Sequence, residues 1–384
     1  MRILLSSSGS RALLLPYLQR PATAKKQRLM TTVAPRQQQK HHRLHPHDLF
    51  GGYGYGGGND RNGQGKGEEE RVVVIMGATG TGKSKLSIDL SAMFSGEVVN
   101  SDKIQVYRGL DITTNKIPEA ERRGVAHHLL GELDPAAGEL PPAGFRALAG
   151  RAIGDISARH RVPVLAGGSN SFIHALLSDP YDPKRDPFCP AEAPERIRLT
   201  RQEAEEGLRY RCCFLWVHVD AAVLAEHLDR RVDEMVGEGM IKELERYFAE
   251  EWEAGRHPGL GKAIGVPEFQ GYFTGRGGRT AATYEAALSA IKANTRRLAE
   301  EQVRKIKRLA ATGWPLRRVD ATAAVAAKVA GEGGTTAPWR RDVLGPSAAA
   351  VGRFLEKDGE GHHNHHLLRR SNRTRVVLPS IKVG

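Results

Sequence analysis

The sequence around residue 77 reads Val72-Val73-Val74-Ile75-Met76-Gly77-Ala78-Thr79-Gly80-Thr81-Gly82-Lys83-Ser84, an apolar run that passes directly into a glycine-rich loop. The apolar run indicates a strand buried on both faces of a parallel sheet. The last eight residues match G-x-x-x-x-G-K-[ST] at every fixed position. A helical pattern follows from Ser84 to Phe94. This order of strand, loop and helix predicts a phosphate-binding loop.

Each residue type in the loop has a physical reason. Glycines let the backbone curl so that its N–H groups point inward, and the following helix aims its positive end at the same place. Lys83 supplies a cation, and Ser84 can reach a Mg²⁺ ion. A plain glycine-rich turn would not explain Lys83 and Ser84 together. We therefore predict a site for two linked phosphates, formed by Gly77, Ala78, Thr79, Gly80, Thr81, Gly82, Lys83 and Ser84.

Further strands and helices alternate after the loop. Short apolar runs occur at 97–99, 162–166 and 213–217, and a helical pattern covers 145–159. This alternation predicts an α/β fold, a P-loop parallel sheet flanked by helices. Two longer helical stretches, 221–252 and 283–309, are separated by a Gly- and Pro-containing passage and predict an added helical subdomain.

Composition limits the class of protein. The chain has 384 residues, of which 40% are hydrophobic, so it can bury a core, and a wholly disordered chain is excluded. Its three cysteines give neither a disulfide framework nor a C-x-x-C spacing, which argues against a zinc site and favours a reducing compartment. No apolar run approaches the roughly 20 residues that a bilayer crossing needs, so we expect no membrane association.

Charge is concentrated at the start of the chain. Residues 1–47 carry nine Lys or Arg and no acid, so only +4 of the formal net charge of +13 belongs to the remainder. Such a leader is typical of an organelle transit peptide, and we expect import into plastids, with the cytoplasm or mitochondrion as alternatives. A basic tail that targets nothing is the other interpretation.

These features predict the layout of the chain. We expect a basic leader over 1–50, a Gly-rich linker over 51–70, a P-loop domain over 71–320 with a helical part at about 221–310, and a low-complexity tail without a fixed fold over 321–384. The tail contains His362, His363, His365 and His366. A solvated tail is favoured over a metal site there, because no ordered scaffold is expected around them.

Asp102 is the first candidate for chemistry outside the loop. It follows the strand at 97–99, and the carboxyl ends of parallel strands point into the crevice where such sheets bind ligands. Asp102 is thus placed as a general base, although capping a helix remains open. Nucleotide hydrolases and kinases hold magnesium with an acid after an apolar strand. Here the strand at 162–166 ends without one, and Asp220 is expected to cap a helix, so a P-loop kinase or ATPase is disfavoured.

Six motifs, in order from about Val72 to Leu309, resemble the isopentenyltransferases that prenylate adenine, and most of all their plant adenylate isopentenyltransferase branch, which makes cytokinins. They are the phosphate loop, Asn-Ser-Asp-Lys-Ile-Gln-Val-Tyr-Arg-Gly-Leu-Asp at 100–111, His-His-Leu-Leu-Gly at 127–131, Gly-Gly-Ser-Asn-Ser-Phe-Ile at 167–173, Arg-Val-Asp-Glu-Met at 231–235, and Lys-Ala-Ile-Gly-Val-Pro-Glu at 262–268. The leader, the linker and the tail lie outside this resemblance.

The resemblance implies a reaction and a set of roles. A dimethylallyl group would move from its diphosphate to N6 of adenine, as in the first step of cytokinin biosynthesis. The loop would hold the donor diphosphate, with the cofactor Mg²⁺ on Ser84 and Thr79. Asp102 would accept an N6 hydrogen as general base. Catalysis would rest on stabilising the departing diphosphate.

Arg231, Lys262 and Glu301 complete the candidate residues. On the helix from 221, Arg231 falls within the face of Leu224, Leu228 and Met235, so it needs an anion, which the family motif implies is the diphosphate. A buried ion pair with an Asp or Glu is the alternative. Lys262 is a weaker phosphate ligand. Glu301 stands where the family usually has arginine. The helical wheel puts it opposite the apolar face of Leu288, Ile291, Thr295 and Leu298, which predicts an outer position.

The acceptor separates two branches of the family. Modifiers of tRNA need a basic surface for many phosphates, whereas this core is only slightly basic. Gly-Ser-Asn-Ser-Phe at 168–172 also resembles the nucleotide-using branch. We therefore expect a monomer that acts on ADP or ATP, and possibly AMP, rather than a tRNA dimethylallyltransferase. The preferred nucleotide and the choice between a plain and a hydroxylated prenyl donor stay open.

Overall fold

The computed structural model describes residues 70–189, 206–252, 256–275, 278–331 and 336–356. Within them, six parallel strands form one sheet in the order β3-β2-β4-β1-β5-β6. The strands are β1 (Arg71–Gly77), β2 (Gly96–Asn100), β3 (His127–His128), β4 (Val162–Gly167), β5 (Arg211–His218) and β6 (Arg317–Asp320). The predicted α/β class and the four predicted strands are confirmed.

Strand β1 lies at the centre of the sheet. Val72 to Met76 are fully buried, and Val74 pairs with Leu165 of β4 on one side and with Phe214 of β5 on the other. An apolar run without alternation fits this position, because helices cover both faces of a parallel sheet. The neighbours β2, β4 and β1 end at Asn100, Gly167 and Gly77, so the loops that follow these three strands meet at one edge.

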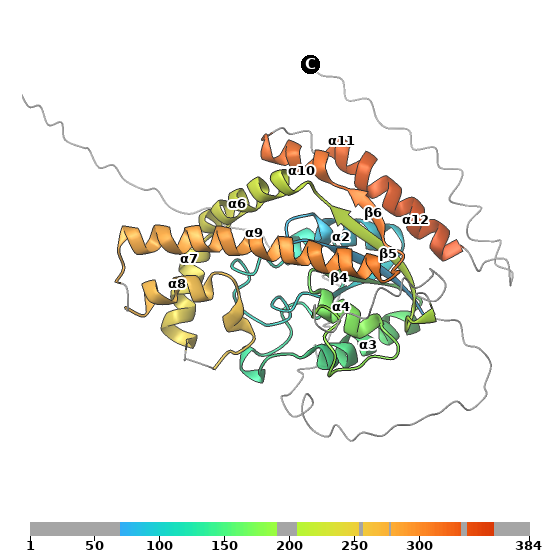
Figure 1. The fold of residues 1–384 in the computed structure, drawn as a ribbon, viewed down its shortest axis with the longest axis horizontal. Coiled ribbons are helices and arrows are strands. Elements are labelled where there is room, and N and C mark those ends of the chain that lie inside the picture. The colour runs from blue at the N-terminus through green and yellow to red at the C-terminus, as the bar shows by residue number, and fades with distance from the viewer. Residues whose placement is uncertain (1–69, 190–205, 253–255, 276–277, 332–335, 357–384) are drawn as a thin grey trace, which may run out of the picture. The chain divides into compact units, whose positions relative to one another are not determined.

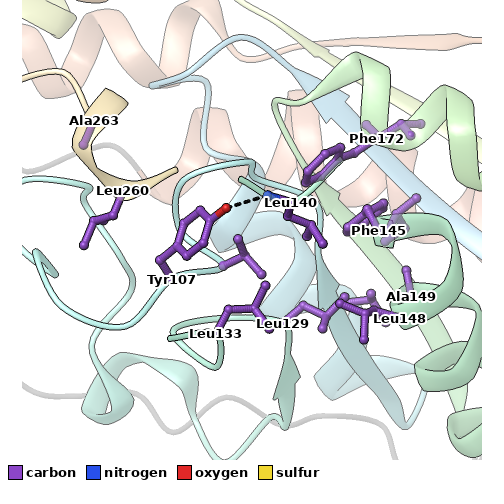
Figure 2. Packing of buried hydrophobic residues seen from close by; sticks show 14 of the residues in the cluster. Tyr107, Leu129, Leu133, Leu140, Phe145, Leu148, Ala149, Phe172, Leu260 and Ala263 are labelled. Carbon is purple, nitrogen blue, oxygen red and sulfur yellow. Dashed lines mark hydrogen bonds between the residues drawn. The ribbon is translucent and has the colours of Figure 1, made fainter. Parts of the chain in front are cut away.

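Helices α3 (Pro142–Ala158) and α4 (Asn170–Leu177) cover one face of the sheet. Phe145 of α3 and Phe172 of α4 stack with ring centroids 4.3 Å apart. Figure 2 shows this core continuing to Tyr107, whose hydroxyl accepts a hydrogen bond from the Leu140 amide at 2.7 Å. Tyr107 is almost fully buried. It therefore anchors the loop after β2 to the core.

The opposite face is covered by α2 (Lys83–Met93), α6 (Ala221–Glu238), α10 (Thr322–Val329) and α12 (Gly345–Glu356). Helix α9 (Ala281–Ala311) is the longest of the described elements. Figure 1 shows α9 running from α7 (Met240–Arg246) and α8 (Val266–Phe273) to the strands. It contributes buried side chains to the clusters on both faces of the sheet.

The helical stretch predicted over 221–252 is broken at Gly239. This residue has φ +110°, a left-handed conformation that glycine adopts without a steric penalty. It ends α6 and precedes α7, which continues into a short helical turn at Tyr247–Glu251. The two helices therefore take different directions, and α6 also packs on the sheet rather than belonging only to an added subdomain.

The prediction of a tail without a fixed fold from residue 321 is wrong for the described residues 321–331 and 336–356. Helices α10 and α12 pack over the sheet beside β5 and β6 (Figure 1), and Val343 and Val351 are fully buried. The composition hid this structure, because alanine favours helices and small residues pack closely, so a few valines at helical spacing suffice. The four tail histidines, the leader and nearly all of the linker lie outside the described residues.

A search of the described residues for helices long and apolar enough to cross a bilayer finds none.

Candidate active site

Two adjoining cavities open at the carboxyl ends of β1, β2 and β4. The larger has a volume of about 900 Å³ and the smaller about 360 Å³. The phosphate loop lines the larger cavity, whereas apolar side chains of α6 and α9 line much of the smaller one. The two cavities share seven lining residues, which mark their junction: Thr79, Asp102, Gln105, Asn115, Gly168, Arg231 and Gln302.

The phosphate loop has the backbone that its glycines predict. Gly80 and Gly82 have φ values of +81° and +92°, and a Cβ on Gly77 would lie 2.6 Å from the carbonyl oxygen of Val217. Five of the eight predicted loop residues line the larger cavity, namely Thr79, Gly80, Gly82, Lys83 and Ser84. Gly77, Ala78 and Thr81 form the buried back of the loop.

Lys83 is the last but one residue of the loop motif and the first residue of α2. Its Nζ donates to the carbonyl oxygen of Ala78 at 2.7 Å. Burial lowers the pKa of Lys83 to about 8, Asp102 opposes this shift and the positive charge of Arg231 adds to it. An anion that binds beside Lys83 would stabilise its charged form and so raise its pKa again.

Asp102 lines both cavities. Its Oδ1 accepts the backbone N–H groups of Ile104 at 2.9 Å and of Gln105 at 3.1 Å. These bonds close a turn, and the alternative that Asp102 caps a helix is wrong, because no helix follows it. Oδ2 has no hydrogen-bond partner among the described residues. One oxygen fixes the orientation of the carboxylate, and the other stays available to a ligand.

Arg231 reaches the junction from α6. Its Nη2 donates to the Thr79 hydroxyl at 3.0 Å, while its Nε is buried without a hydrogen-bond partner in the described part of the chain. Burial lowers the pKa of Arg231 to about 10, with Glu234 and Asp102 opposing the shift. No carboxylate of the described residues forms an ion pair with it. A partly buried cation without an ion-paired carboxylate is the state expected of an anion ligand.

Gln302 on α9 is a site residue that the sequence reasoning missed. Its Oε1 accepts the Thr79 amide at 2.8 Å, and its backbone oxygen accepts the side-chain amide of Asn170 at 3.1 Å. A Cβ on Gly168 would lie 2.3 Å from Gln302 Nε2, which explains a glycine there. The only sequence signal was a polar residue on the buried face of α9, in line with Thr295 and Ile306.

Glu243 on α7 is a second residue that was missed. Its carboxylate accepts the amides of Ile112 at 3.0 Å and Thr113 at 2.7 Å, and the Thr113 hydroxyl at 2.7 Å. Asp102 lines both cavities, and these bonds hold the loop that follows it against the helical part of the chain. Nothing in the sequence around Glu243 distinguishes it from the other charged residues of α7.

Lys262 lies on the smaller cavity and not beside the phosphate loop. It forms an ion pair with Glu139, which also pairs with Lys103 at 2.9 Å. Hydrogen bonds from these two lysines lower the pKa of Glu139. Lys103 and Lys305 line the same cavity, so three lysines are present along it, in addition to Arg231.

Glu301 is exposed, so the outer position that the helical wheel predicts is confirmed. Its side chain is about half exposed, yet it lines the smaller cavity together with Leu298 and Lys305. Leu298 is one of the exposed large apolar side chains rather than a core residue. The buried face of α9 is rotated relative to the one we assumed, and Ala299 and Gln302 lie on it.

The donor set of the larger cavity suits Mg²⁺. The search of the described residues for three clustered His, Cys, Asp or Glu finds no such group. Ser84 and Thr79 line the cavity, and each carries a hydroxyl, a hard oxygen donor. Mg²⁺ is commonly bound by one or two protein oxygens together with substrate phosphates. These residues therefore fit a magnesium ion that arrives with a phosphorylated ligand.

Comparison with known proteins identifies similar chains. The family model described as "IPP transferase" matches residues 105–208 and 192–308. "Adenylate isopentenyltransferase" of Humulus lupulus is 49% identical over 293 residues, which are 71% of this chain and 87% of that protein. "Adenylate isopentenyltransferase 1, chloroplastic" of Arabidopsis thaliana is 46% identical over 286 residues, covering 71% of this chain and 77% of that protein.

A solved structure agrees in fold. A eukaryotic dimethylallyltransferase acting on tRNA superposes with a TM-score of 0.60 at 24% identity, covering 75% of this chain and 80% of that chain. At this identity the likeness concerns the arrangement of the sheet and helices alone.

Proposed function

Since the chain belongs to the IPP transferase family, we propose that its two cavities bring together dimethylallyl diphosphate and the adenine of ADP or ATP. The enzyme is an adenylate dimethylallyltransferase, which transfers the dimethylallyl group to N6 of the adenine nucleotide. The observation that carries the assignment of substrates to cavities is the junction: one carboxylate, Asp102, lies where a cavity bordered by a phosphate loop meets one with apolar walls.

The donor diphosphate belongs in the larger cavity. The backbone N–H groups of the loop, Lys83 and Arg231 supply positive charge there, and negative charge grows on the diphosphate as the carbon–oxygen bond breaks. The dimethylallyl group can carry positive charge as an allylic cation, so the carbon–oxygen bond can break before N6 attacks. Mg²⁺, when bound by Ser84 and Thr79, would neutralise further charge on the same diphosphate.

The acceptor adenine belongs in the smaller cavity. Apolar side chains such as Val232, Met235 and Ile264 suit the faces of a purine ring. The lone pair of N6 is delocalised into the ring, so N6 is a weak nucleophile. Asp102 Oδ2 can accept an N6 hydrogen and restore electron density while N6 attacks C1 of the prenyl group. Lys103, Lys262 and Lys305 are available for the phosphates of the nucleotide.

A single reaction tests the acceptor. Purified protein is incubated with Mg²⁺, dimethylallyl diphosphate and AMP, ADP, ATP or tRNA, and the molecular masses of the products are measured. We expect prenylated ADP and ATP, unmodified tRNA and only a modest change of rate when salt is doubled, because a nucleotide presents few phosphates. Isopentenyladenosine in tRNA with ADP and ATP unmodified would assign the protein to the tRNA branch instead.

The wider setting of the enzyme is also proposed. A basic leader whose first 47 residues contain no acid supports import into plastids, and the Arabidopsis relative is named chloroplastic.

A further inference from the structure

The phosphate loop packs on a tryptophan from the far end of the chain. Trp339, in the helical turn Trp339–Leu344, is 6% exposed. A Cβ on Gly82 would lie only 2.8 Å from Cη2 and Cζ3 of the Trp339 ring. The ring thus fills the space beside Gly82, the residue directly before Lys83.

The ring is held in place from α2. Its Nε1 donates to Asp89 Oδ2 at 3.0 Å, and Lys85 Nζ lies 5.2 Å from the ring centroid. Asp89 is also nearly buried and accepts bonds from Lys85 at 3.1 Å and from Arg123 at 2.7 Å. Arg123 follows a segment at 117–122 that lines the larger cavity. Three parts of the chain are joined at this carboxylate.

The contact falls at a sensitive point of the loop. Gly82 is the N-cap of α2 and has a left-handed backbone, which sets the direction of the first N–H groups of that helix. Those N–H groups, with Lys83, form the cradle proposed for the diphosphate. Electrostatic stabilisation requires donors that are already aimed when the ligand arrives. A ring that fixes Gly82 therefore helps to keep these N–H groups oriented towards the diphosphate.

We propose that Trp339 is a positioning residue for the donor diphosphate. Its ring and its bond to Asp89 hold the turn at Gly82 and Lys83 in the form that binds phosphate, so residues 336–356 belong functionally to the donor site. This inference rests on the proposed placement of the donor in the larger cavity. It goes beyond that placement, because Trp339 lines neither of the two cavities.

Two variants separate the ring from its hydrogen bond. Trp339→Phe keeps an aromatic ring but loses the Nε1 donor, and Trp339→Leu loses both. We expect the KM for dimethylallyl diphosphate to rise about threefold in the first, as for one lost hydrogen bond, and about tenfold or more in the second. The KM for ADP should stay within twofold. The Kd of Mg²⁺ with inorganic diphosphate, measured by calorimetry, should follow the donor KM.

Trp314→Phe is the matched control. Trp314 lies against Phe214 and His174 on the other face of the sheet, so its loss should leave the donor KM unchanged. Tryptophan fluorescence supplies a second signal: inorganic diphosphate with Mg²⁺ should change the emission of the wild type and of Trp314→Phe, but not that of Trp339→Phe.

Several results would overturn the inference. An unchanged donor KM in folded Trp339→Leu would do so, as would an equal rise of both KM values with a lower melting temperature, which a purely structural role predicts. If Trp339→Leu does not fold, Trp339→Phe decides by the same measurements. A wild-type protein that prenylates ADP but binds no inorganic diphosphate would remove the inference alone, whereas one that prenylates no nucleotide would remove the proposed function as well.

Discussion

The guanidinium of Arg231 donates a hydrogen bond to the hydroxyl of Thr79 at 3.0 Å, and so joins α6 to the phosphate loop across 152 positions of sequence. The same guanidinium keeps a buried Nε without a partner in the described residues. One of its nitrogens is fixed by the loop, and the other stays ready for an anion in the cavity. This arrangement favours the diphosphate over the structural ion pair as the explanation of Arg231.

Replacing Arg231 should therefore affect the reaction more than the fold. In Arg231→Ala we expect a loss of about 3–4 kcal/mol of transition-state stabilisation, as for one charge-assisted contact to a leaving group. Steady-state kinetics with dimethylallyl diphosphate and ADP measure it. Arg231→Lys keeps the charge but not the hydrogen-bond geometry, so its activity should lie between those of the wild type and Arg231→Ala. A variant with a lower melting temperature and normal kinetics would favour the structural ion pair.

Asp102→Asn separates geometry from proton acceptance. Asparagine can keep the two backbone bonds that Oδ1 accepts from Ile104 and Gln105, but its amide nitrogen cannot accept an N6 hydrogen. Turnover should fall by roughly 10²–10⁴, with nucleotide binding weakened less. Single-turnover kinetics and calorimetry with ADP measure the two effects. Near-normal turnover in the folded variant would exclude Asp102 as the base.

Local patterns predicted the central fold and the phosphate loop. The β1 run, the glycines and Lys83 carry their signal within a dozen residues, since period and spacing encode a buried strand and a phosphate cradle directly. Asp220 was also predicted correctly: its side chain accepts the Ala222 amide at 3.0 Å and caps α6. Each of these features depends on neighbours in sequence.

The features that were missed depend on distant partners. Gln302, Glu243 and Trp339 are ordinary helical residues until α9, α7 and the C-terminal segment pack around the loops, so no local pattern distinguishes them. Leu298 was assigned to the buried face of α9, yet it is exposed at a cavity. An apolar residue that lines a ligand site resembles a core residue in sequence.

Lys83 predicts a pH dependence. Burial lowers its pKa to about 8 in the protein without ligand, so its charge is present at pH 7 and is lost as the pH rises through 8. The value of kcat/KM for the donor reports the free enzyme, and it should fall about tenfold between pH 7 and 9 if only the cation binds diphosphate. Lys83→Arg should remove this fall. An unchanged profile in the wild type would mean that the charge is not needed.

The leader, although outside the described residues, gives a prediction about import. Residues 1–50 fused to a fluorescent protein should reach plastids, because the segment is basic and residues 1–47 contain no acid. Protein that begins at residue 70 should keep full turnover in vitro. Microscopy of the fusion in plant cells measures the first expectation; fluorescence that stays in the cytosol would refute targeting, and fluorescence in mitochondria would change the organelle.

Glu301 should weaken binding of the most highly charged acceptors. It lines the smaller cavity beside Lys305, where the phosphates of the nucleotide are proposed to lie, and its carboxylate opposes them. In Glu301→Arg the KM should fall most for ATP, less for ADP and least for AMP. The side chain is half exposed, so we expect no more than about a fivefold change for ATP, and less at high salt.

Glu300→Arg supplies the matched control for this test. It reverses the same charge one residue away, but Glu300 borders a different cavity between α6 and α9. KM values for the three nucleotides, at low and at high salt, should therefore change with Glu301→Arg and not with Glu300→Arg. Equal changes for AMP, ADP and ATP, or equal effects of the two variants, would show that the acceptor phosphates lie elsewhere. A fall graded by phosphate number and restricted to Glu301 would place the phosphate chain along this side of α9, because only a nearby charge distinguishes one phosphate from three.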